Sequence, residues 1–390
     1  MRTSGASTGD DGFDHGHRRR GQRAVRHDGV DSNPGTIDEP MRTIQWAISQ
    51  AESLGGIDTI RVAEGSYAID YANDAHIVMV DGISIHGGYR ADWGARDPAA
   101  YPTRIVDESA TVIASNEDDP HRAIEVPASV GAGTVLEGVH VEIATGQFRA
   151  ALLVLGDVTV RASVIEPVVD DTSVSTYGLR VIDAAPTVVG NHLRFDAVGA
   201  DGLSFAVSAE GSDGTFADNV IDLSGVEGYG YGFYFIFGAP SVLANSVWIA
   251  AGSNMTGMWL NYATPTVDNN VFESEDQGAV CVWSSGGDSV PASLRNNVLD
   301  CYYTLFGSDP LRSWTTIMEV QSGLPDAEDN LKLPEPFTSA AVDMALDETA
   351  PCTVTMGGRD LGAAWPQDID GVARTVPPSI GAYEWDGACQ

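Results

Sequence analysis

The sequence predicts an all-β protein built as a single-stranded right-handed parallel β-helix, with an N-terminal capping helix and an irregular C-terminal cap. Three observations carry this prediction. A pattern recurs at intervals of 24 to 28 residues between residues 133 and 301, apolar and polar positions alternate within each copy, and no helical stretch separates the copies. Repeats of this length, which cannot bury an apolar face alone, stack on their neighbours as solenoids.

Seven copies of the pattern share a reference position, which is asparagine in the last five. The reference residues are Val139, Ser163, Asn191, Asn219, Asn245, Asn270 and Asn297. Every copy has an apolar residue three positions before the reference and another two positions after it. This alternation is typical of a strand with one buried face. We expect the asparagines to stack as a hydrogen-bonded ladder.

A second strand precedes the first in each unit and begins at a glycine. The clearest examples begin at Gly178, Gly202, Gly232, Gly257 and Gly278. We expect their inward side chains to be Leu179, Leu203, Phe233, Met258 and Ala279, followed two residues later by Val181, Phe205, Phe235, Leu260 and Cys281. Strands this short bury their apolar face by coiling into parallel sheets about 4.8 Å apart, and parallel crossovers are right-handed.

The chain is predicted to form one domain with four parts. Residues 1–27 are expected to be a poorly ordered leader, 28–132 the N-terminal cap and first coils, 133–302 the regular coils, and 303–390 a C-terminal cap or tail. Both ends of an open solenoid need covering. Residues 40–53 place Ile44, Ala47, Ile48 and Ala51 on one helical face, which suits a plug over the first coil. The tail after about residue 305 is rich in proline and aspartate, and we expect it to cover the last coil.

The formal net charge of −34 argues against polyanionic partners. Repulsion opposes binding to DNA, RNA or an anionic membrane face, so no nucleic-acid partner is expected. No run of 18 apolar residues is present, and no transmembrane segment is predicted. The first 30 residues contain no apolar stretch typical of a secretion signal. We expect a monomer.

The four cysteines show no spacing typical of a zinc site, and no metal site is predicted. Cys281 and Cys301 fall on predicted inward strand positions and are interpreted as two buried free thiols. Cys352 and Cys389 bracket the tail. A disulfide between them would stabilise the tail by limiting the unfolded chain, and the sequence leaves this bridge open.

Three segments carry a resemblance to a known family. The first runs from Asp31-Ser-Asn-Pro-Gly-Thr through Arg42-Thr-Ile-Gln-Trp-Ala-Ile, the second contains Ile85-His-Gly-Gly-Tyr, and the third pairs Asp368-Ile-Asp-Gly-Val-Ala-Arg with Ser379-Ile-Gly-Ala-Tyr-Glu. Together they resemble the pectin-lyase-like right-handed β-helix proteins of bacteria over roughly residues 30–390. The resemblance implies a secreted or cell-surface protein. In the catalytic branches it implies an enzyme that cuts polysaccharide, but the catalytic motifs of those branches are absent here.

The most suggestive candidate site is the outward side of the strands that begin at glycine. Arg180, Ser204, Tyr234 and Trp259 are expected in one column, with Asn261 beside Trp259. Aromatic rings pack against the C–H faces of pyranose rings, while Arg and Asn side chains meet hydroxyls or carboxylates. The predicted carbohydrate-binding residues are therefore Arg180, Tyr234, Trp259 and Asn261. The alternative is that Tyr234 and Trp259 only cover core beneath a loop, and contiguous exposed aromatics would favour binding.

A second outward column is mostly acidic. It holds Glu142, Glu166, Arg194, Asp222, Trp248, Glu273 and Asp300. Glu273 and Asp300 are expected one coil apart, close to the carboxylate separation of retaining glycosidases, which makes them the candidate catalytic pair. Any two outward acids on adjacent coils meet this criterion, and a solvated face explains them equally well. Acid-rich turns at residues 326–330 and 368–371 suit calcium or, alternatively, only the turn itself.

Three functions follow from these observations. The first is an exported or cell-surface β-helix that presents an elongated face to a polysaccharide or another surface component without catalysis. The second is a polysaccharide lyase or glycoside hydrolase that acts along the coils. The third is a structural stalk or adhesin, which predicts no aromatic groove.

Overall fold

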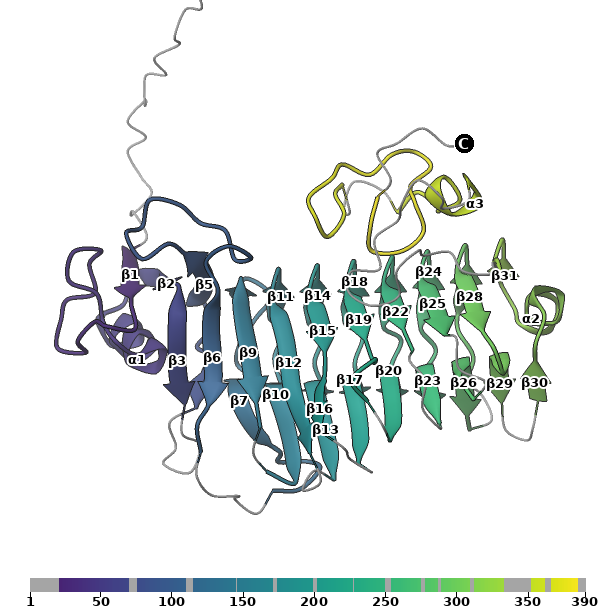
Figure 1. Ribbon diagram of the computed structural model, residues 1–390, viewed down its shortest axis with the longest axis horizontal. Coiled ribbons are helices and arrows are strands. Elements are labelled where there is room, and N and C mark those ends of the chain that lie inside the picture. Colours follow the sequence, from purple (N-terminus) through teal and green to yellow (C-terminus); the bar gives the residue numbers. More distant parts are fainter. Residues whose placement is uncertain are drawn as a thin grey trace, which may run out of the picture.

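Short parallel strands stack along one axis in the computed structural model and form three sheets that run the length of the molecule (Figure 1). The structure describes residues 21–384 apart from 70–75, 110–114, 145, 171–173, 199–201, 227, 250–253, 275–277, 287–288, 309–311, 333–351 and 362–365. No helix in these described residues is long and apolar enough to cross a membrane.

Each coil contributes one strand to each sheet. Within the described residues, the first sheet holds eleven strands, β1 (Gly21–Val25), β2 (Ile57–Ala63), β5 (Ser84–Tyr89), β8 (Val135–Glu137), β11 (Thr159–Arg161), β14 (Thr187–Val189), β18 (Thr215–Ala217), β21 (Ser241–Leu243), β24 (Thr266–Asp268), β27 (Ser293–Arg295) and β31 (Ala327–Glu328).

The second sheet carries the longest strands of the regular coils. It consists of β4 (Ile77–Val78), β7 (His121–Val126), β10 (Phe148–Val154), β13 (Ser175–Ile182), β17 (Leu203–Glu210), β20 (Tyr229–Ile236), β23 (Met255–Asn261), β26 (Val280–Ser285), β29 (Thr304–Ser308) and β30 (Arg312–Trp314). The third sheet consists of β3 (Gly65–Ile69), β6 (Thr103–Asp107), β9 (Val139–Ile143), β12 (Val164–Asp170), β15 (His192–Arg194), β19 (Val220–Asp222), β22 (Ser246–Trp248), β25 (Val271–Ser274) and β28 (Val298–Cys301), with β16 (Asp196–Val198) beside β12.

The interior is one continuous apolar core, as the repeat predicts. All fourteen apolar positions that flank the reference residues are buried, and each pairs with its counterpart one coil away, as Val160 does with Val188. The core cluster extends from Val25 on β1 to Ala327 on β31. This confirms the parallel β-helix, because only coiling lets strands of three to eight residues share such a core.

The predicted asparagine ladder is present. The side-chain oxygen of each asparagine accepts the backbone N–H of the reference residue one coil earlier, as Asn191 does from Ser163 at 3.1 Å and Asn245 does from Asn219 at 3.0 Å. The side-chain NH₂ of Asn219 also donates to Asn245 Oδ1 at 3.0 Å and to the carbonyl of Val188 at 2.9 Å. The ladder ends one member later than predicted, at Asn330, which accepts from Asn297.

The N-terminal cap is the helix α1 (Ile44–Leu54), whose buried residues are the four predicted ones, Ile44, Ala47, Ile48 and Ala51. The leader was predicted too long, because residues 21–25 form β1 and pair in parallel with β2. Only two of its five residues, Ala24 and Val25, are buried, so the strand gives little apolar signal.

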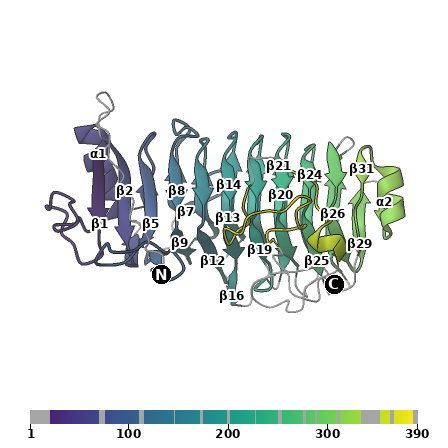
Figure 2. The same cartoon turned by 90° about the horizontal axis from the view of Figure 1, so that it is seen from above.

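The last coil is covered by the helix α2 (Ile317–Gly323), whose Thr316 and Glu319 form a capping box. The tail after about residue 305 was expected to cover this coil, and α2, which lies in that tail, does so. The later part of the tail, the described residues 352–361 and 366–384 with α3 (Cys352–Thr355), lies along the side of the solenoid beside β19 to β28 and is called the C-terminal segment (Figures 1 and 2). Its apolar side chains Val354, Ile380, Ala382 and Tyr383 pack on outward residues of the third sheet.

The register of two strands in the second sheet differs from the prediction. Leu179 pairs with Val207, not with Leu203, and Met258 pairs with Val282, not with Ala279. The physical reason is a corner at which two consecutive residues, such as Ala206 and Val207, both face the core. Strict period-2 alternation fails there, so the sequence pattern cannot place the strand.

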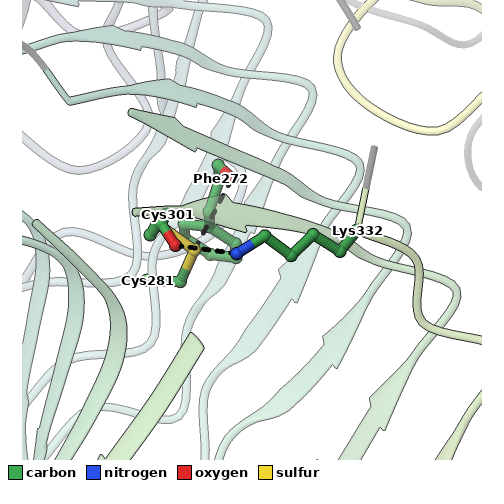
Figure 3. Close-up of a disulfide and its surroundings, with 4 residues drawn as sticks. All are labelled: Phe272, Cys281, Cys301 and Lys332. Carbon is green, nitrogen blue, oxygen red and sulfur yellow. Dashed lines mark hydrogen bonds between the residues drawn. A yellow bond between two sulfur atoms is a disulfide. The ribbon is translucent and has the colours of Figure 1, made fainter. Parts of the chain in front are cut away.

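The prediction of two free thiols was wrong, because Cys281 and Cys301 form a disulfide (Figure 3). The two cysteines lie on β26 and β28 of one coil, on facing sheets, with their Cα atoms 5.5 Å apart. Lys332 donates to the carbonyl of Cys301 at 3.4 Å. Cys352 is also disulfide-bonded, whereas its predicted partner Cys389 lies outside the described residues.

Candidate functional site

Six aromatic side chains gather on the outer face of the second sheet, away from the core. We call this group, Tyr177, Phe205, Tyr231, Tyr234, Trp259 and Trp283, the aromatic face. The residues come from five successive strands, β13 to β26, and occupy two adjacent columns. One column runs Arg122, Ala150, Tyr177, Phe205, Tyr231 and Thr256, and the other runs Leu153, Arg180, Ser208, Tyr234, Trp259 and Trp283.

The rings are in contact along the solenoid axis. Tyr177 stacks on Phe205 with ring centroids 5.1 Å apart, and Phe205 stacks on Tyr231 at 4.9 Å. Tyr231 meets Trp259 edge-on at 5.8 Å, and Trp259 lies 5.8 Å from Trp283. These separations are those of favourable aromatic pairs, so the rings form one continuous apolar surface.

Accessibility differs along the aromatic face. Tyr177 and Phe205 are buried, whereas Tyr231, Tyr234, Trp259 and Trp283 are half-buried. The predicted pair Tyr234 and Trp259 therefore lies in contact, at a centroid distance of 6.4 Å, and reaches solvent. The pair is contiguous, as the condition for binding requires, but it is half-buried and not fully exposed.

Trp259 and Trp283 are held in place by their neighbours. The indole N–H of Trp259 donates to Ser285 Oγ at 2.8 Å. Trp283 lies flat over Gly307 one coil later, where an added Cβ would come within 2.3 Å of the ring. Asn261 is half-buried two residues after Trp259, and its side-chain amide makes no hydrogen bond within the described part of the chain.

Arg180 lies in the predicted column, but it is only 2% exposed. Its guanidinium donates to Ser208 Oγ at 3.2 Å and to Glu210 Oε2 at 2.8 Å, and it lies over the ring of Tyr177. Arg180 therefore stabilises the aromatic face by packing against Tyr177, and its guanidinium is not accessible to a ligand. The column position assigned to Ser204 is occupied by Ser208, because of the register difference in β17.

Burial keeps the phenols of the aromatic face neutral. Burial and, second to it, the nearby charge of Glu117 raise the pKa of Tyr177 to about 12. The same two causes, in the same order, raise the pKa of Tyr234. Both hydroxyls thus keep their proton and can donate as well as accept hydrogen bonds at neutral pH.

Sequence reasoning missed four members of the aromatic face, Tyr177, Phe205, Tyr231 and Trp283. Trp283 was missed because the strand that begins near Gly278 was placed out of register, and Phe205 was assigned to the core for the same reason. The available signal was the spacing of Trp259 and Trp283, which lie one coil apart in paired positions.

The acidic column exists, but its catalytic pair is not accessible. Glu273 pairs with Asp300 on the next coil as predicted. Glu273 is only 5% exposed, and its neighbours Trp248 and Val271 are covered by the C-terminal segment. Asp300 is half-buried, but a polysaccharide cannot reach the carboxylate of Glu273, so the geometry does not support the two acids as a glycosidase pair.

A cluster that the sequence did not reveal lies on the third sheet. Nitrogen or oxygen atoms of His140, Glu142 and Glu166 all lie within 4.8 Å of one another. Two guanidiniums already neutralise the carboxylates, since Arg104 bonds Glu142 at 2.5 Å and Arg194 bonds Glu166 at 2.8 Å. A divalent cation would have to displace these partners. The cluster is best described as an ion-pair network.

The two turns considered for calcium use their acids for structure. Asp368 accepts the backbone N–H groups of Asp370, Val372 and Glu384. Asp326 has a positive φ and bonds Arg295. These contacts are typical of aspartates that stabilise turns. Both segments therefore fit the alternative interpretation, in which the acids only form the turn.

The described residues also form a cavity of about 560 Å³ between α1 and β3. Its walls include Arg42, Gln45 and the exposed Trp46 from the helix side, and Ser66 and Ala68 from the strand. It lies at the N-terminal end of the solenoid, several coils from the aromatic face.

Known proteins similar to this chain include one family of unknown function and several solved structures. Residues 27–230 match the model of a family described as "Protein of unknown function (DUF1565)". No curated protein matches the chain. Among solved structures, pectate lyase Pel9A is 14% identical with a TM-score of 0.47, over 94% of this chain and 96% of that one.

Two further solved structures are more distant. A rhamnogalacturonan lyase is 11% identical with a TM-score of 0.31, over 91% of this chain and 95% of that one. ORF18 of Geobacillus virus E2 is 12% identical with a TM-score of 0.29, over 73% and 61%. Similarities of this size do not extend to substrate or activity.

Proposed function

We propose that this chain, which belongs to the DUF1565 family of proteins of unknown function, binds polysaccharide chains through the aromatic face of its second sheet. The observation that carries the proposal is the row of half-buried rings Tyr234, Trp259 and Trp283, which lie one coil apart along the axis. Coils repeat about every 4.8 Å, close to the length of one pyranose unit, so successive sugars meet successive rings.

The polar groups beside the rings suit a sugar. The Asn261 amide and the hydroxyls of Tyr231 and Tyr234 supply donors and acceptors next to the aromatic planes. Rigid, preorganised rings lose little conformational entropy on binding. We propose binding without catalysis, because Glu273, one of the two acids predicted for cleavage, is buried beside the C-terminal segment.

The test is binding to a panel of soluble polysaccharides, measured by affinity electrophoresis and by calorimetry with oligosaccharides. Trp259→Ala should weaken binding at least tenfold, about 1.4 kcal/mol, because it removes the central ring of the row. Trp46→Ala is the matched control, since Trp46 is exposed on α1 and distant from the aromatic face. Equal binding by wild type and Trp259→Ala would contradict the proposal.

Cleavage is measured separately on the same polysaccharides. Reducing ends or unsaturated products that form with wild type, and are lost in Trp259→Ala, would replace the binding role by that of a hydrolase or lyase. Binding without products supports the proposal. Neither binding nor products would leave the role of a stalk or adhesin.

We also propose that the protein works outside the cytoplasm, at the cell surface or beyond it. The support is the buried Cys281–Cys301 disulfide and the bonded state of Cys352, since structural disulfides persist in oxidising compartments. Protein isolated from its native cells and alkylated under denaturing conditions should contain no labelled cysteine. Labelling of Cys281 and Cys301 in native material would overturn this assignment.

A further inference from the structure

We infer that the aromatic face selects uncharged polysaccharides and rejects polyuronates, an inference that rests on the carbohydrate-binding function proposed above. A polyuronate carries one carboxylate on each sugar, and a surface that binds it needs unpaired cations. Around the aromatic face, the cations of the two columns are paired and the exposed charges are negative.

The two columns that contain the aromatic face hold two described cations, Arg122 and Arg180, and both are already paired. Arg122 bonds Asp119 at 2.5 Å and Glu125 at 2.7 Å. Arg180 is 2% exposed and bonds Glu210 at 2.8 Å. Neither guanidinium is available to a carboxylate on a ligand, because each would first have to break a charge-assisted hydrogen bond.

The exposed charges beside the rings are negative. Glu210 lies at the end of β17, and its side chain is 39% exposed. It stands in the same column as Asn261, two coils away, next to Tyr234. Glu117 is exposed and close enough for its charge to act on Tyr177 and Tyr234. A polyuronate lying along the rings therefore passes two carboxylates, in a molecule whose net charge is −34.

The uncharged polar groups match the hydroxyls of a neutral sugar. The half-buried Tyr231, Tyr234 and Asn261 offer hydroxyl and amide groups, and burial raises the pKa of both phenols, which stay protonated. Such groups form hydrogen bonds with sugar hydroxyls and compensate no ligand charge. The expected ligand is thus a flat, extended, uncharged polysaccharide.

The experiment compares neutral oligosaccharides of β-1,4-glucan, β-1,4-mannan and β-1,4-xylan with oligogalacturonates of the same length. Calorimetry is done at about 20 mM and about 200 mM salt, since screening at the higher salt weakens surface repulsion. A chelator is present throughout, so that calcium cannot bridge carboxylates. At least one neutral series should bind at least tenfold more tightly than the oligogalacturonate at low salt, and the ratio should shrink at high salt.

Removing a carboxylate beside the rings tests directly whether negative charge weakens the binding of oligogalacturonate. Glu117→Gln should raise oligogalacturonate affinity about twofold or more at low salt and leave neutral affinity unchanged, because repulsion falls and the contacts of Arg180 stay intact. Glu52→Gln, at an exposed acid on α1, is the control for the change in net charge.

The outcomes separate the inference from the proposed function. If oligogalacturonate binds as tightly as the neutral series, and Trp259→Ala abolishes this binding, the site is real and the charge selection is wrong. If Trp259→Ala changes no binding, the proposed function fails and the inference fails with it. Unchanged oligogalacturonate affinity in Glu117→Gln also overturns the inference.

Discussion

Glu166 on β12 keeps its charge because two hydrogen-bond donors on neighbouring coils bind its carboxylate. His140 lies 2.7 Å from its carboxylate and Arg194 lies 2.8 Å away, while Glu142 is its neighbour in the column. Burial alone would raise the pKa of Glu166, but the hydrogen bonds from His140 and Arg194 outweigh burial and lower the pKa to about 2. Because the pKa of Glu166 is lowered in the folded protein, the network stabilises the fold in a pH-dependent way.

The folded pKa of Glu166 is below its ordinary value of 4.5, so its contribution is fully present above about pH 4.5 and is lost as the pH falls towards 2. We expect the free energy of unfolding to fall over this window. Glu166→Gln should remove about 1 to 2 kcal/mol at pH 7, after discounting for solvent screening, and little at pH 2. Urea unfolding at a series of pH values measures this. A difference between the two proteins that does not change with pH would contradict it.

The side of a strand on which a side chain lies could be predicted from the sequence better than the exposure of that side chain to solvent. Tyr234, Trp259 and Asn261 lie where the repeat puts them, because alternation decides which side of a strand a side chain takes. Alternation does not say what covers that side. Arg180 and Glu273 face outward as predicted, yet both are buried. Glu210 and Tyr177 cover Arg180, whereas Glu273 lies beside the C-terminal segment.

The asparagine ladder is the element that joins the coils at one bend. Asn245 Oδ1 accepts from the backbone and the side chain of Asn219, and Asn245 Nδ2 donates to the carbonyl of Phe216 at 2.9 Å. Asn245 is fully buried, so water cannot replace these partners. Removing one member leaves buried groups unpaired on both neighbouring coils.

Asn245→Ala should therefore lower the free energy of unfolding by about 2 to 4 kcal/mol, as expected when several buried hydrogen-bonding groups lose their partner. Asn261→Ala is the matched control, because that half-buried asparagine makes no side-chain hydrogen bond within the described residues. We expect the control to change stability by less than about 0.5 kcal/mol. Chemical denaturation measures both, and similar losses in the two variants would argue against the ladder as a stabilising element.

Secondary-structure elements could be predicted where the repeat is regular, and the predictions were wrong where the repeat is interrupted. The ladder and α1 follow from fixed spacing and from one apolar helical face. The Cys281–Cys301 disulfide could not be predicted, because it depends on how closely two sheets approach within a coil. The position of β17 could not be predicted either, since a corner with two inward residues breaks the alternation.

At the scale of the whole molecule, the C-terminal segment is attached to the solenoid by a buried charge cluster. Arg374 bonds Asp218 on the solenoid at 2.6 Å and Glu384 within the segment at 3.4 Å, and all three side chains are buried. Burial raises the pKa of Asp218 to about 6 although Arg374 opposes the shift. The resemblance at residues 368–384 thus marks an attachment site, which the sequence motif alone did not place beside β19 to β28.

Arg374→Ala should detach this segment while the coils stay folded. The change leaves the carboxylates of Asp218 and Glu384 buried without their cation, which costs about 3 to 5 kcal/mol. The coils keep their own core and ladder, so the loss falls on the docked segment. Limited proteolysis followed by mass spectrometry should show early cleavage between residues 352 and 384 in this variant. Arg359→Ala is the control, because Arg359 is 48% exposed and its bond to Asp268 contributes little. Simultaneous cleavage throughout the coils would show that the segment and the solenoid unfold as one unit.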